Sequence, residues 1–368
     1  MINFNQRMNT LTTRLKQEGA DLAIIMDPSN IFYFTGFNSD PHERFMGLII
    51  NVKTEKYTLF VPALDESAAA EASAVQNIVT ISDEQDPFEI VQFHISKEGI
   101  SNIYLEKGYI NIARYEGFQN IFDKSSYHDM SSIINEQRLI KSRQEIEYLQ
   151  EAVDIIEKVL SEGIKKVKVG MTELELTGEL ELLMKKYGAI GPSFSTTVLS
   201  GEKAALPHGS PGERQFKNGD FLLIDFGVIT QKGYCSDMTR TFIIGEADEK
   251  QKSIYNIVKD SNQAALDLVK SGVPLKEFDI AAREVIKKNG YDEYFNNRVG
   301  HGLGIEVHEA PSIHEHNEAI AKAGLFFTIE PGIYIPDYGG VRIEDEVYIN
   351  ENGEAEILTS FPRDLRIL

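Results

Sequence analysis

Residues 219–240 read Gly-Asp-Phe-Leu-Leu-Ile-Asp-Phe-Gly-Val-Ile-Thr-Gln-Lys-Gly-Tyr-Cys-Ser-Asp-Met-Thr-Arg. The apolar run before Asp225 is typical of a strand buried on both faces, and the acid stands where another apolar residue is expected. A second strand-like run carries Asp237. Positions 225 and 237 are symmetric about Gln231, so an odd-length hairpin loop with a bulge at Gly233 would place the two carboxylates directly opposite each other. Opposed residues have Cβ atoms about 4.5–5.5 Å apart, and two acids that close need cations between them.

The same pattern recurs near the C-terminus. Leu-Phe-Phe-Thr-Ile-Glu-Pro-Gly ends its apolar run at Glu330, and Gly-Val-Arg-Ile-Glu carries Glu344; the two positions are symmetric about Asp337. Between the hairpins, Gly-His-Gly-Leu-Gly-Ile-Glu-Val-His supplies His301 and His308. Each acid alone would be interpreted as a solvated residue at a strand end. Four acids and a histidine in this order predict an oxygen-rich site for divalent ions of the Mn, Co, Fe or Zn kind.

In order and context, these residues resemble the pita-bread metallopeptidases, the superfamily of methionine aminopeptidases, Xaa-Pro aminopeptidases and prolidases. The Glu-Pro-Gly and Val-Arg-Ile-Glu contexts match as well, and the resemblance is strong over residues 131–368 and weaker before them. The gap between the two aspartates is one residue longer than the family pattern, and we assign the extra residue to the loop tip. The resemblance implies two divalent ions per subunit, with Mn²⁺ preferred over Co²⁺ or Zn²⁺, and five metal ligands: Asp225, Asp237, His301, Glu330 and Glu344.

The resemblance also assigns a role to each ligand. Asp237 and Glu344 would bridge both ions. Asp225 would hold one ion, and His301 with Glu330 would hold the other. Glu330 would in addition shuttle a proton from the attacking water to the leaving nitrogen, since a carboxylate has two oxygens.

Two further histidines are implied to be catalytic. The counterpart of His308 stabilises the carbonyl oxygen as it becomes an oxyanion. The counterpart of His208, in Ala-Leu-Pro-His-Gly, contacts the substrate near the leaving imide. Arg342 shares the strand face of Glu344, so it would orient that ligand or meet a substrate carboxylate.

A dipeptidase needs a cation for the terminal carboxylate of its substrate. Some prolidases supply an arginine within the segment that corresponds to residues 309–329, but this segment contains none here. We interpret the aromatic-rich stretch 32–45, which includes Asp-Pro-His-Glu-Arg, as a loop. In related peptidases the corresponding region reaches over the substrate cleft, often that of a partner subunit. Four candidate substrate-binding residues follow: His42, Arg44, Arg298 and Arg342.

The composition of the 368 residues excludes several classes of protein. A formal net charge of −20 argues against nucleic-acid binding, which depends on clustered Lys and Arg. The single cysteine, Cys235, cannot form an internal disulfide, and we interpret it as a buried structural thiol. The N-terminus lacks the apolar region of a signal peptide, and no apolar run is long enough for a membrane span. We therefore predict a soluble cytoplasmic enzyme.

The fold class is predicted to be α/β (α+β), with two domains. Strands alternate with helices over residues 1–130, which indicates a small N-terminal creatinase-like α/β domain. Residues 131–368 would form a pita-bread (creatinase/aminopeptidase-like) catalytic domain. Capping boxes at Ser142 and Thr172 begin two of its helices.

The predicted function is that of a proline-selective exopeptidase acting on small proline-containing peptides, as a homodimer. We favour a prolidase-type Xaa-Pro dipeptidase that uses a dinuclear metal-activated hydroxide, with an Xaa-Pro aminopeptidase as the alternative. A creatinase-like hydrolase without metals and a non-enzymatic binding protein are disfavoured, because all five ligand positions are intact. Loss of activity in chelator and its return with Mn²⁺ or Co²⁺ would separate these possibilities.

Overall fold

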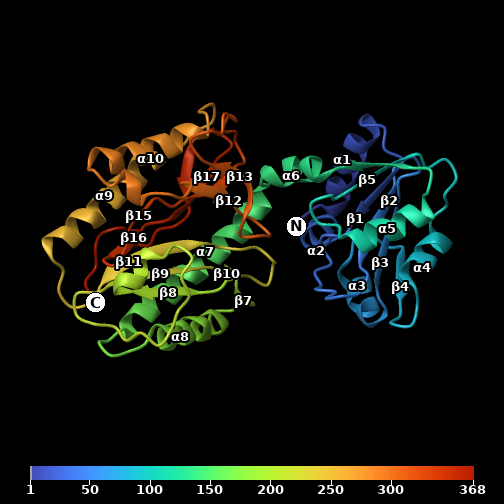
Figure 1. The fold of residues 1–368 in the computed structure, drawn as a ribbon. Helices are drawn as coiled ribbons and strands as arrows, with labels where there is room; N and C mark the ends of the chain where they lie inside the picture. The colour runs from blue at the N-terminus through green and yellow to red at the C-terminus, as the bar shows by residue number, and fades with distance from the viewer. Residues whose placement is uncertain (1) are drawn as a thin grey trace. The chain divides into compact units, whose positions relative to one another are not determined.

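The computed structural model describes residues 2–368, which divide into two compact units (Figure 1). The first unit ends at Arg138 and the second begins at Leu139, whereas the sequence predicted a boundary near residue 130. The difference is helix α6, Ser131–Leu139. Its buried Arg138 donates a hydrogen bond from Nη1 to Asn30 Oδ1 at 2.8 Å, which ties the helix to the first unit.

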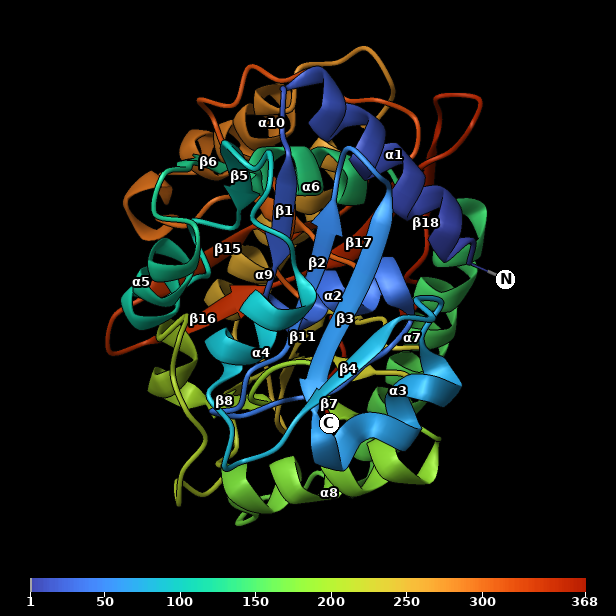
Figure 2. The same ribbon diagram turned by 90° about the vertical axis from the view of Figure 1, so that its right-hand side faces the viewer.

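A six-stranded mixed sheet forms the centre of the first unit, in the order β4-β3-β2-β1-β5-β6. Strands β1, β2 and β3 pair antiparallel and lie side by side in Figure 2, and the outer strands pair parallel to their neighbours. Helices flank this sheet, so the predicted α/β domain is confirmed. The elements are α1 (Phe4–Gln17), β1 (Leu22–Ile25), α2 (Pro28–Thr35), β2 (Gly47–Asn51), β3 (Lys56–Pro62), α3 (Glu66–Ala72), β4 (Ile78–Ile81), α4 (Pro87–His94), β5 (Asn102–Leu105), α5 (Ile112–Ile121), β6 (Ser126–Asp129) and α6.

Part of the predicted loop 32–45 is helical. Asp27 caps the N-terminus of α2 by accepting a hydrogen bond from the backbone N of Ser29 at 2.9 Å, and a proline occupies the first turn. Gly36 ends the helix in the left-handed region, with φ of 82°. The cap lies before the aromatic run, which is why the aromatic residues alone did not reveal the helix.

Two pairs of helices cover the strands of the second unit, as Figure 1 shows. Helices α7 and α8 pack on one side of β9 in a core that includes Leu222 and Ile224. Helices α9 and α10 pack in a second core that includes Phe221 and Leu223. Strand β9 is therefore buried on both faces, as its apolar run predicted, and the predicted catalytic fold is confirmed. The elements are α7 (Arg143–Gly163), α8 (Glu173–Lys186), β7 (Gly191–Pro192), β8 (Thr197–Ser200), β9 (Phe221–Phe226), β10 (Val228–Ile229), β11 (Met238–Ile243), α9 (Glu249–Leu266), α10 (Lys276–Lys288), β12 (Gly300–Gly302), β13 (Glu309–Ile313), β14 (Phe326–Ile329), β15 (Gly332–Ile335), β16 (Gly339–Arg342), β17 (Asp345–Ile349) and β18 (Ala355–Ile357).

Two helices of the second unit begin where the sequence predicted. Ser142 and Thr172 each form a capping box, with Glu145 and Glu175 respectively, at the starts of α7 and α8. No helix within residues 2–368 combines the length and the apolar character that crossing a membrane would require.

The register of the first hairpin differs from the prediction. Asp225 lies opposite Thr239, not opposite Asp237. The loop closes with hydrogen bonds from Gly233 N to Thr230 O at 2.9 Å and from Thr230 N to Tyr234 O at 3.0 Å, and Gly233 has φ of 74°. These bonds define a three-residue hairpin loop with a glycine bulge. The pairing is symmetric about Lys232, one residue later than the Gln231 used in the prediction. The two aspartates are consequently diagonal neighbours on one face of the hairpin.

The register of the second hairpin is as predicted. Gly332 pairs with Arg342 between β15 and β16, and Ile329 pairs with Asp345 between β14 and β17. Both pairings share the same centre of symmetry, so Glu330 lies opposite Glu344. The turn contains Asp337 in the left-handed region, with φ of 60°.

Candidate active site

The acids of both hairpins meet in one cavity of about 590 Å³ in the second unit. Asp225 is the penultimate residue of strand β9, and Asp237 immediately precedes β11. His301 lies in β12, Glu330 follows β14, and Glu344 stands between β16 and β17. The structure therefore brings together all five residues that the sequence predicted as metal ligands.

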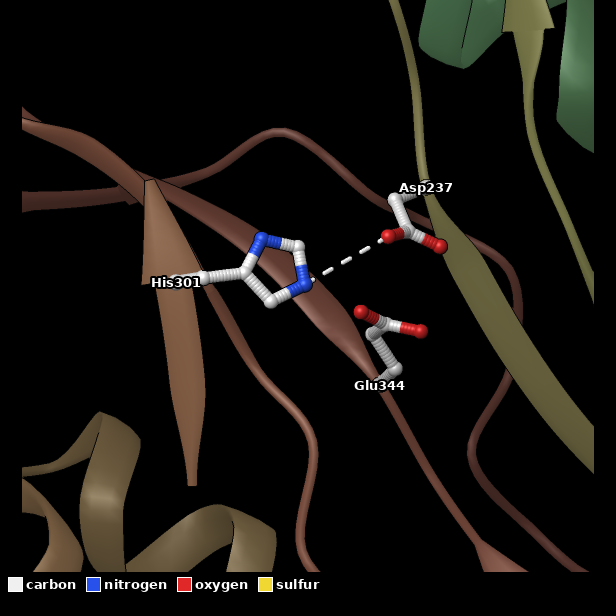
Figure 3. Close-up of side chains that lie close together, drawn as sticks. All are labelled: Asp237, His301 and Glu344. Carbon is white, nitrogen blue, oxygen red and sulfur yellow. Dashed lines mark ion pairs between the residues drawn. The ribbon is translucent and has the colours of Figure 1, made fainter. Parts of the chain in front are cut away.

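Three of these side chains form a compact cluster. One ligand atom from each of Asp237, His301 and Glu344 lies within 4.8 Å of the others, and all three residues are buried. Figure 3 shows the imidazole of His301 directed toward both carboxylates. Its Nε2 lies 3.6 Å from Asp237 Oδ2 and 3.3 Å from Glu330 Oε1. Its Nδ1 lies 3.1 Å from Gly302 O, and a proton on Nδ1 leaves Nε2 to bind a metal.

Buried carboxylate oxygens in this cluster lack partners. Asp225 Oδ1, Asp237 Oδ1 and Glu344 Oε1 make no hydrogen bond to any of residues 2–368. Burial, followed by the charges of the neighbouring acids, raises the pKa of Asp237 and of Glu344 well above the usual range. A buried carboxylate without a partner is costly unless it coordinates a cation. The residues therefore fit divalent metal ions.

The side chain of Arg342 binds residues of the acid cluster and its surroundings. Its buried guanidinium forms an ion pair with Asp225, and its Nε donates to Thr239 Oγ1 at 2.9 Å. Thr239 Oγ1 in turn donates to Glu344 Oε2 at 2.8 Å. The Nη1 of Arg342 donates to Tyr334 Oη at 2.8 Å. The sequence analysis did not single out Tyr334, although its position on the same face of the hairpin as Arg342 was a usable signal.

A second group of buried side chains holds the backbone of the ligands. Arg240 donates from Nη1 to the carbonyl oxygen of Glu344 and from Nη2 to Asp345 Oδ1 at 2.7 Å. Glu346 Oε1 accepts a hydrogen bond from the backbone N of Asp237. Glu346 follows a ligand by two positions on a strand, and the sequence analysis missed it because an acid near Glu344 gave no sign of facing the other hairpin.

Both predicted catalytic histidines line the cavity. The ring of His308 meets that of His301 edge to face, with centroids 4.3 Å apart. Burial first, and then the nearby His301 and Arg298, lowers the pKa of His308 to about 4. The imidazole of His308 is therefore neutral at pH 7 and can donate a hydrogen bond without carrying a charge.

The loop that carries His208 is held at its base. The buried carboxylate of Glu173, at the start of α8, accepts hydrogen bonds from Ser200 N at 2.8 Å and from Gly212 N at 2.9 Å. Lys203 forms an ion pair with the same carboxylate. Glu173 thus joins both ends of the loop, and the exposed His208 at its tip faces the cavity.

The four candidate substrate-binding residues fall into two groups. Arg298 and Arg342 line the cavity. Arg298 donates from Nη1 to Ser312 Oγ at 3.1 Å and makes no ion pair with any carboxylate among residues 2–368. His42 and Arg44 lie in the first unit, where Arg44 Nε and Nη2 bind the carboxylate of Asp83 at 2.8 and 3.2 Å. The contact of His42 and Arg44 with substrate stays a prediction.

The single cysteine is a structural group, as interpreted from the sequence. Cys235 is buried, and its Sγ lies 3.2 Å from the carbonyl oxygen of Ile305, to which it donates. Burial, and then the charge of nearby acids, raises the pKa of the thiol.

Comparisons with known proteins identify the family of the chain. The profile of the family described as Metallopeptidase family M24 matches residues 147–351, and that of the Creatinase/Prolidase N-terminal domain matches residues 7–140. The dipeptidase-named protein YkvY of Bacillus subtilis (strain 168) is 40% identical over 364 residues, which cover 98% of this chain and 99% of that protein.

Solved structures are similar over almost the whole chain. An Xaa-Pro dipeptidase from Bacillus anthracis is 32% identical, with a TM-score of 0.92 and 100% of both chains covered. A prolidase from Pyrococcus horikoshii OT3 is 33% identical, with a TM-score of 0.90, and covers 98% of this chain and 99% of its own. An X-Pro aminopeptidase from Thermotoga maritima MSB8 is 31% identical, with a TM-score of 0.89 and the same coverage.

Proposed function

The chain belongs to metallopeptidase family M24, and from this premise we propose that it is an Xaa-Pro dipeptidase, which hydrolyses the bond before proline in dipeptides. The observation that carries the proposal is the single cavity that collects four acids, three histidines and Arg298. The acids suit hard divalent ions, the histidines suit proton transfer and oxyanion stabilisation, and the arginine suits a terminal carboxylate. The solved Xaa-Pro dipeptidase and prolidases with the same fold support the choice of substrate.

In this proposal the site holds two divalent ions, with Mn²⁺ as the preferred metal. Asp237 and Glu344 would hold both ions, Asp225 would hold one of them, and His301 with Glu330 would hold the other. Buried oxygens of Asp225, Asp237 and Glu344 without hydrogen-bond partners among residues 2–368 support a metal-binding role for these three acids. When bound, divalent ions lower the pKa of water to near neutrality and act as Lewis acids toward the scissile carbonyl.

Glu330 is the proposed proton shuttle. Burial works against its charge, but the hydrogen bond and charge of His301, followed by the charges of Arg342 and Arg298, hold its pKa below the usual value. Glu330 is thus ionised at neutral pH and can accept a proton from the attacking water. It then passes this proton to the leaving proline nitrogen, which has no N–H of its own in the substrate.

The two histidines act on the substrate rather than on the water. The neutral imidazole of His308 donates a hydrogen bond to the carbonyl oxygen as negative charge develops on it. His208 contacts the substrate near the leaving imide nitrogen. His208 stands on an exposed loop, so it can adjust to the substrate while Glu173 holds the base of the loop.

Arg298 is the best-supported anchor for the substrate's terminal carboxylate. Arg342 already neutralises Asp225, and Arg44 is held by Asp83. Arg298 lines the same cavity as His308 and has a hydroxyl as its partner there, so its guanidinium can accept a carboxylate without breaking an ion pair. An arginine fork binds a carboxylate through two hydrogen bonds.

The second candidate function is that of an Xaa-Pro aminopeptidase acting on longer peptides, which the similarity to the Thermotoga maritima enzyme favours. Product analysis with an Xaa-Pro dipeptide and an Xaa-Pro-Yaa tripeptide tests the two. A dipeptidase cleaves the dipeptide and leaves the tripeptide largely intact. Faster cleavage of the tripeptide would show that the aminopeptidase is the correct assignment. Both functions predict loss of activity in chelator and recovery with Mn²⁺ or Co²⁺, whereas metal-free creatinase-like chemistry predicts no loss.

We also propose that the enzyme works in the cytoplasm as a homodimer, in which the loop with His42 and Arg44 covers an active site of the partner. The one buried thiol suits a reducing compartment. Light scattering of the purified protein measures the subunit number, and a monomer with full activity would contradict the dimer.

A further inference from the structure

The loop that carries His308 is short and connects two paired strands. It runs over residues 303–308, between β12 and β13, and Gly302 pairs with Glu309 where the loop closes. The register of this pair shifts between His301 and Gly302, so the strand pairing alone does not set the position of the loop. The placement of His308 against His301 must depend on side chains as well.

Glu309 clamps the loop from within. One carboxylate oxygen, Oε1, accepts hydrogen bonds from the backbone N of Ile305 at 2.9 Å and from that of Glu306 at 3.1 Å. The other oxygen, Oε2, lies 2.8 Å from Lys141 Nζ. The side chains of Lys141 and Glu309 are only 2% and 6% exposed, so this ion pair is shielded from water.

The lysine of the ion pair is fixed to the body of the second unit. The backbone N of Lys141 donates to Gly324 O at 2.8 Å, immediately before the start of α7. A separate backbone hydrogen bond, from Cys235 N to Gly304 O at 2.8 Å, connects the loop to the first hairpin. The ion pair therefore connects the loop to the segment before α7, and the backbone hydrogen bond gives it a second attachment.

We propose that Lys141 and Glu309 are positioning residues for His308, and that they set the geometry of the oxyanion-stabilising imidazole. The proposal rests on the function proposed above. Removing a cation from a carboxylate this well buried is costly, because it breaks a buried ion pair. Without Lys141, we expect Glu309 to hold the amides of Ile305 and Glu306 less firmly. A shift of His308 by about 1 Å would then cost about 10²-fold in kcat.

A pair with the same pattern of hydrogen bonds in the first unit, whose lysine is 58% exposed, provides a control. Asp21 accepts hydrogen bonds from Ser101 N at 2.8 Å and Asn102 N at 2.9 Å, and its Oδ1 lies 2.7 Å from Lys53 Nζ. Lys53→Met removes the cation from a carboxylate that holds two backbone amides, as Lys141→Met does. No histidine of the cavity lies in that unit, so Lys53→Met should leave kcat unchanged.

The experiment compares four proteins with the wild type: Lys141→Met, Glu309→Gln, the double variant with both changes, and Lys53→Met. We expect kcat for an Xaa-Pro dipeptide to fall about 10²-fold in Lys141→Met, with KM and metal content near wild-type values. Glu309→Gln retains an oxygen for the two amides and removes only the charge. Because glutamine has nearly the same shape as glutamate, this variant tests the proposal if Lys141→Met folds poorly. In the double variant, which removes both charges of this ion pair, kcat should recover to within a few-fold of the wild type.

Hydrogen–deuterium exchange of a peptide covering residues 303–309 gives a readout that does not depend on activity. Exchange should accelerate in Lys141→Met, return toward the wild-type rate in the double variant and stay at that rate in Lys53→Met. Wild-type kcat in folded Lys141→Met, or a kcat loss that only parallels metal loss, would overturn the proposal. If the wild type cleaves no Xaa-Pro peptide but the exchange pattern is as expected, the proposed function fails while the clamp stands.

Discussion

Replacing Arg298 by alanine tests the substrate assignment most directly. The guanidinium lines the catalytic cavity and has Ser312 Oγ as its partner at 3.1 Å. A hydrogen bond to a charged group contributes about 1.5–3 kcal/mol. Because Arg298 is exposed, water screens its interaction and the lower end of this range applies. About 1.5 kcal/mol corresponds to a roughly 10-fold rise in KM for an Xaa-Pro dipeptide.

The assay compares a dipeptide with its C-terminal amide in wild type and variant. Amidation removes the carboxylate, so it should cost the wild type about 10-fold in kcat/KM and the Arg298→Ala variant almost nothing. The measurement belongs at pH 8, because Arg298 helps to lower the pKa of His308 and its removal would let that imidazole charge more readily. Arg44→Ala, assayed in the same way, tests the other candidate arginine.

Equal costs of amidation in wild type and Arg298→Ala would refute the assignment. The carboxylate would then be held by another residue, and a matching loss of sensitivity in Arg44→Ala would identify it. If no arginine variant changes the sensitivity to amidation, these arginines do not bind the terminal carboxylate of the substrate, which would favour an aminopeptidase.

Three further outcomes follow from the site. Asp237→Ala and Glu344→Ala should each abolish activity and lower the metal content measured by mass spectrometry; full activity of either variant would rule out bridging. His308→Ala should lower kcat by about 10²–10³-fold while metal content is retained, and metal loss with normal turnover per metal would make His308 a ligand instead. In an NMR titration, His308 should titrate near pH 4, because burial and neighbouring cations favour its neutral form. Since this folded pKa lies below the unfolded value, its contribution to stability is complete above about pH 6.5 and is lost as the pH falls toward 4; a midpoint near 6.5 would contradict this.

The fold was predictable where apolar runs and caps stand alone in the sequence. The capping box at Ser142 and the two-sided burial of β9 are local features, and both are confirmed. The two hairpins show the limit. Symmetry placed Glu330 opposite Glu344 correctly, but it misplaced Asp237 because the first loop adopts a three-residue turn with a bulge at Gly233. Register depends on turn geometry, and a count of residues does not specify it.

The candidate site was predictable where a charged residue interrupts the apolar run of a buried strand. An acid at the end of a buried strand is conspicuous, and all five predicted ligands line one cavity. The residues that support the ligands and the His308 loop interrupt no such apolar run. Glu309 is a single acid beside His308, and Glu346 is an acid next to Asp345. Their contacts with Lys141 and with the backbone of Asp237 join segments far apart in the chain. Only the folded structure brings these segments together.

The charge balance of the cavity bears on the number of metal ions. Four carboxylates and two guanidiniums line it: Arg342, which is paired with Asp225, and Arg298. The protein thus leaves an excess of two negative charges in the cavity. One divalent ion would neutralise this excess, whereas two would leave two positive charges, which suit a hydroxide nucleophile together with the terminal carboxylate of the substrate. We therefore expect two ions per chain in the active enzyme, measured by titrating metal-free protein with Mn²⁺ and following heat and activity together. Full activity at one ion per chain would contradict this expectation.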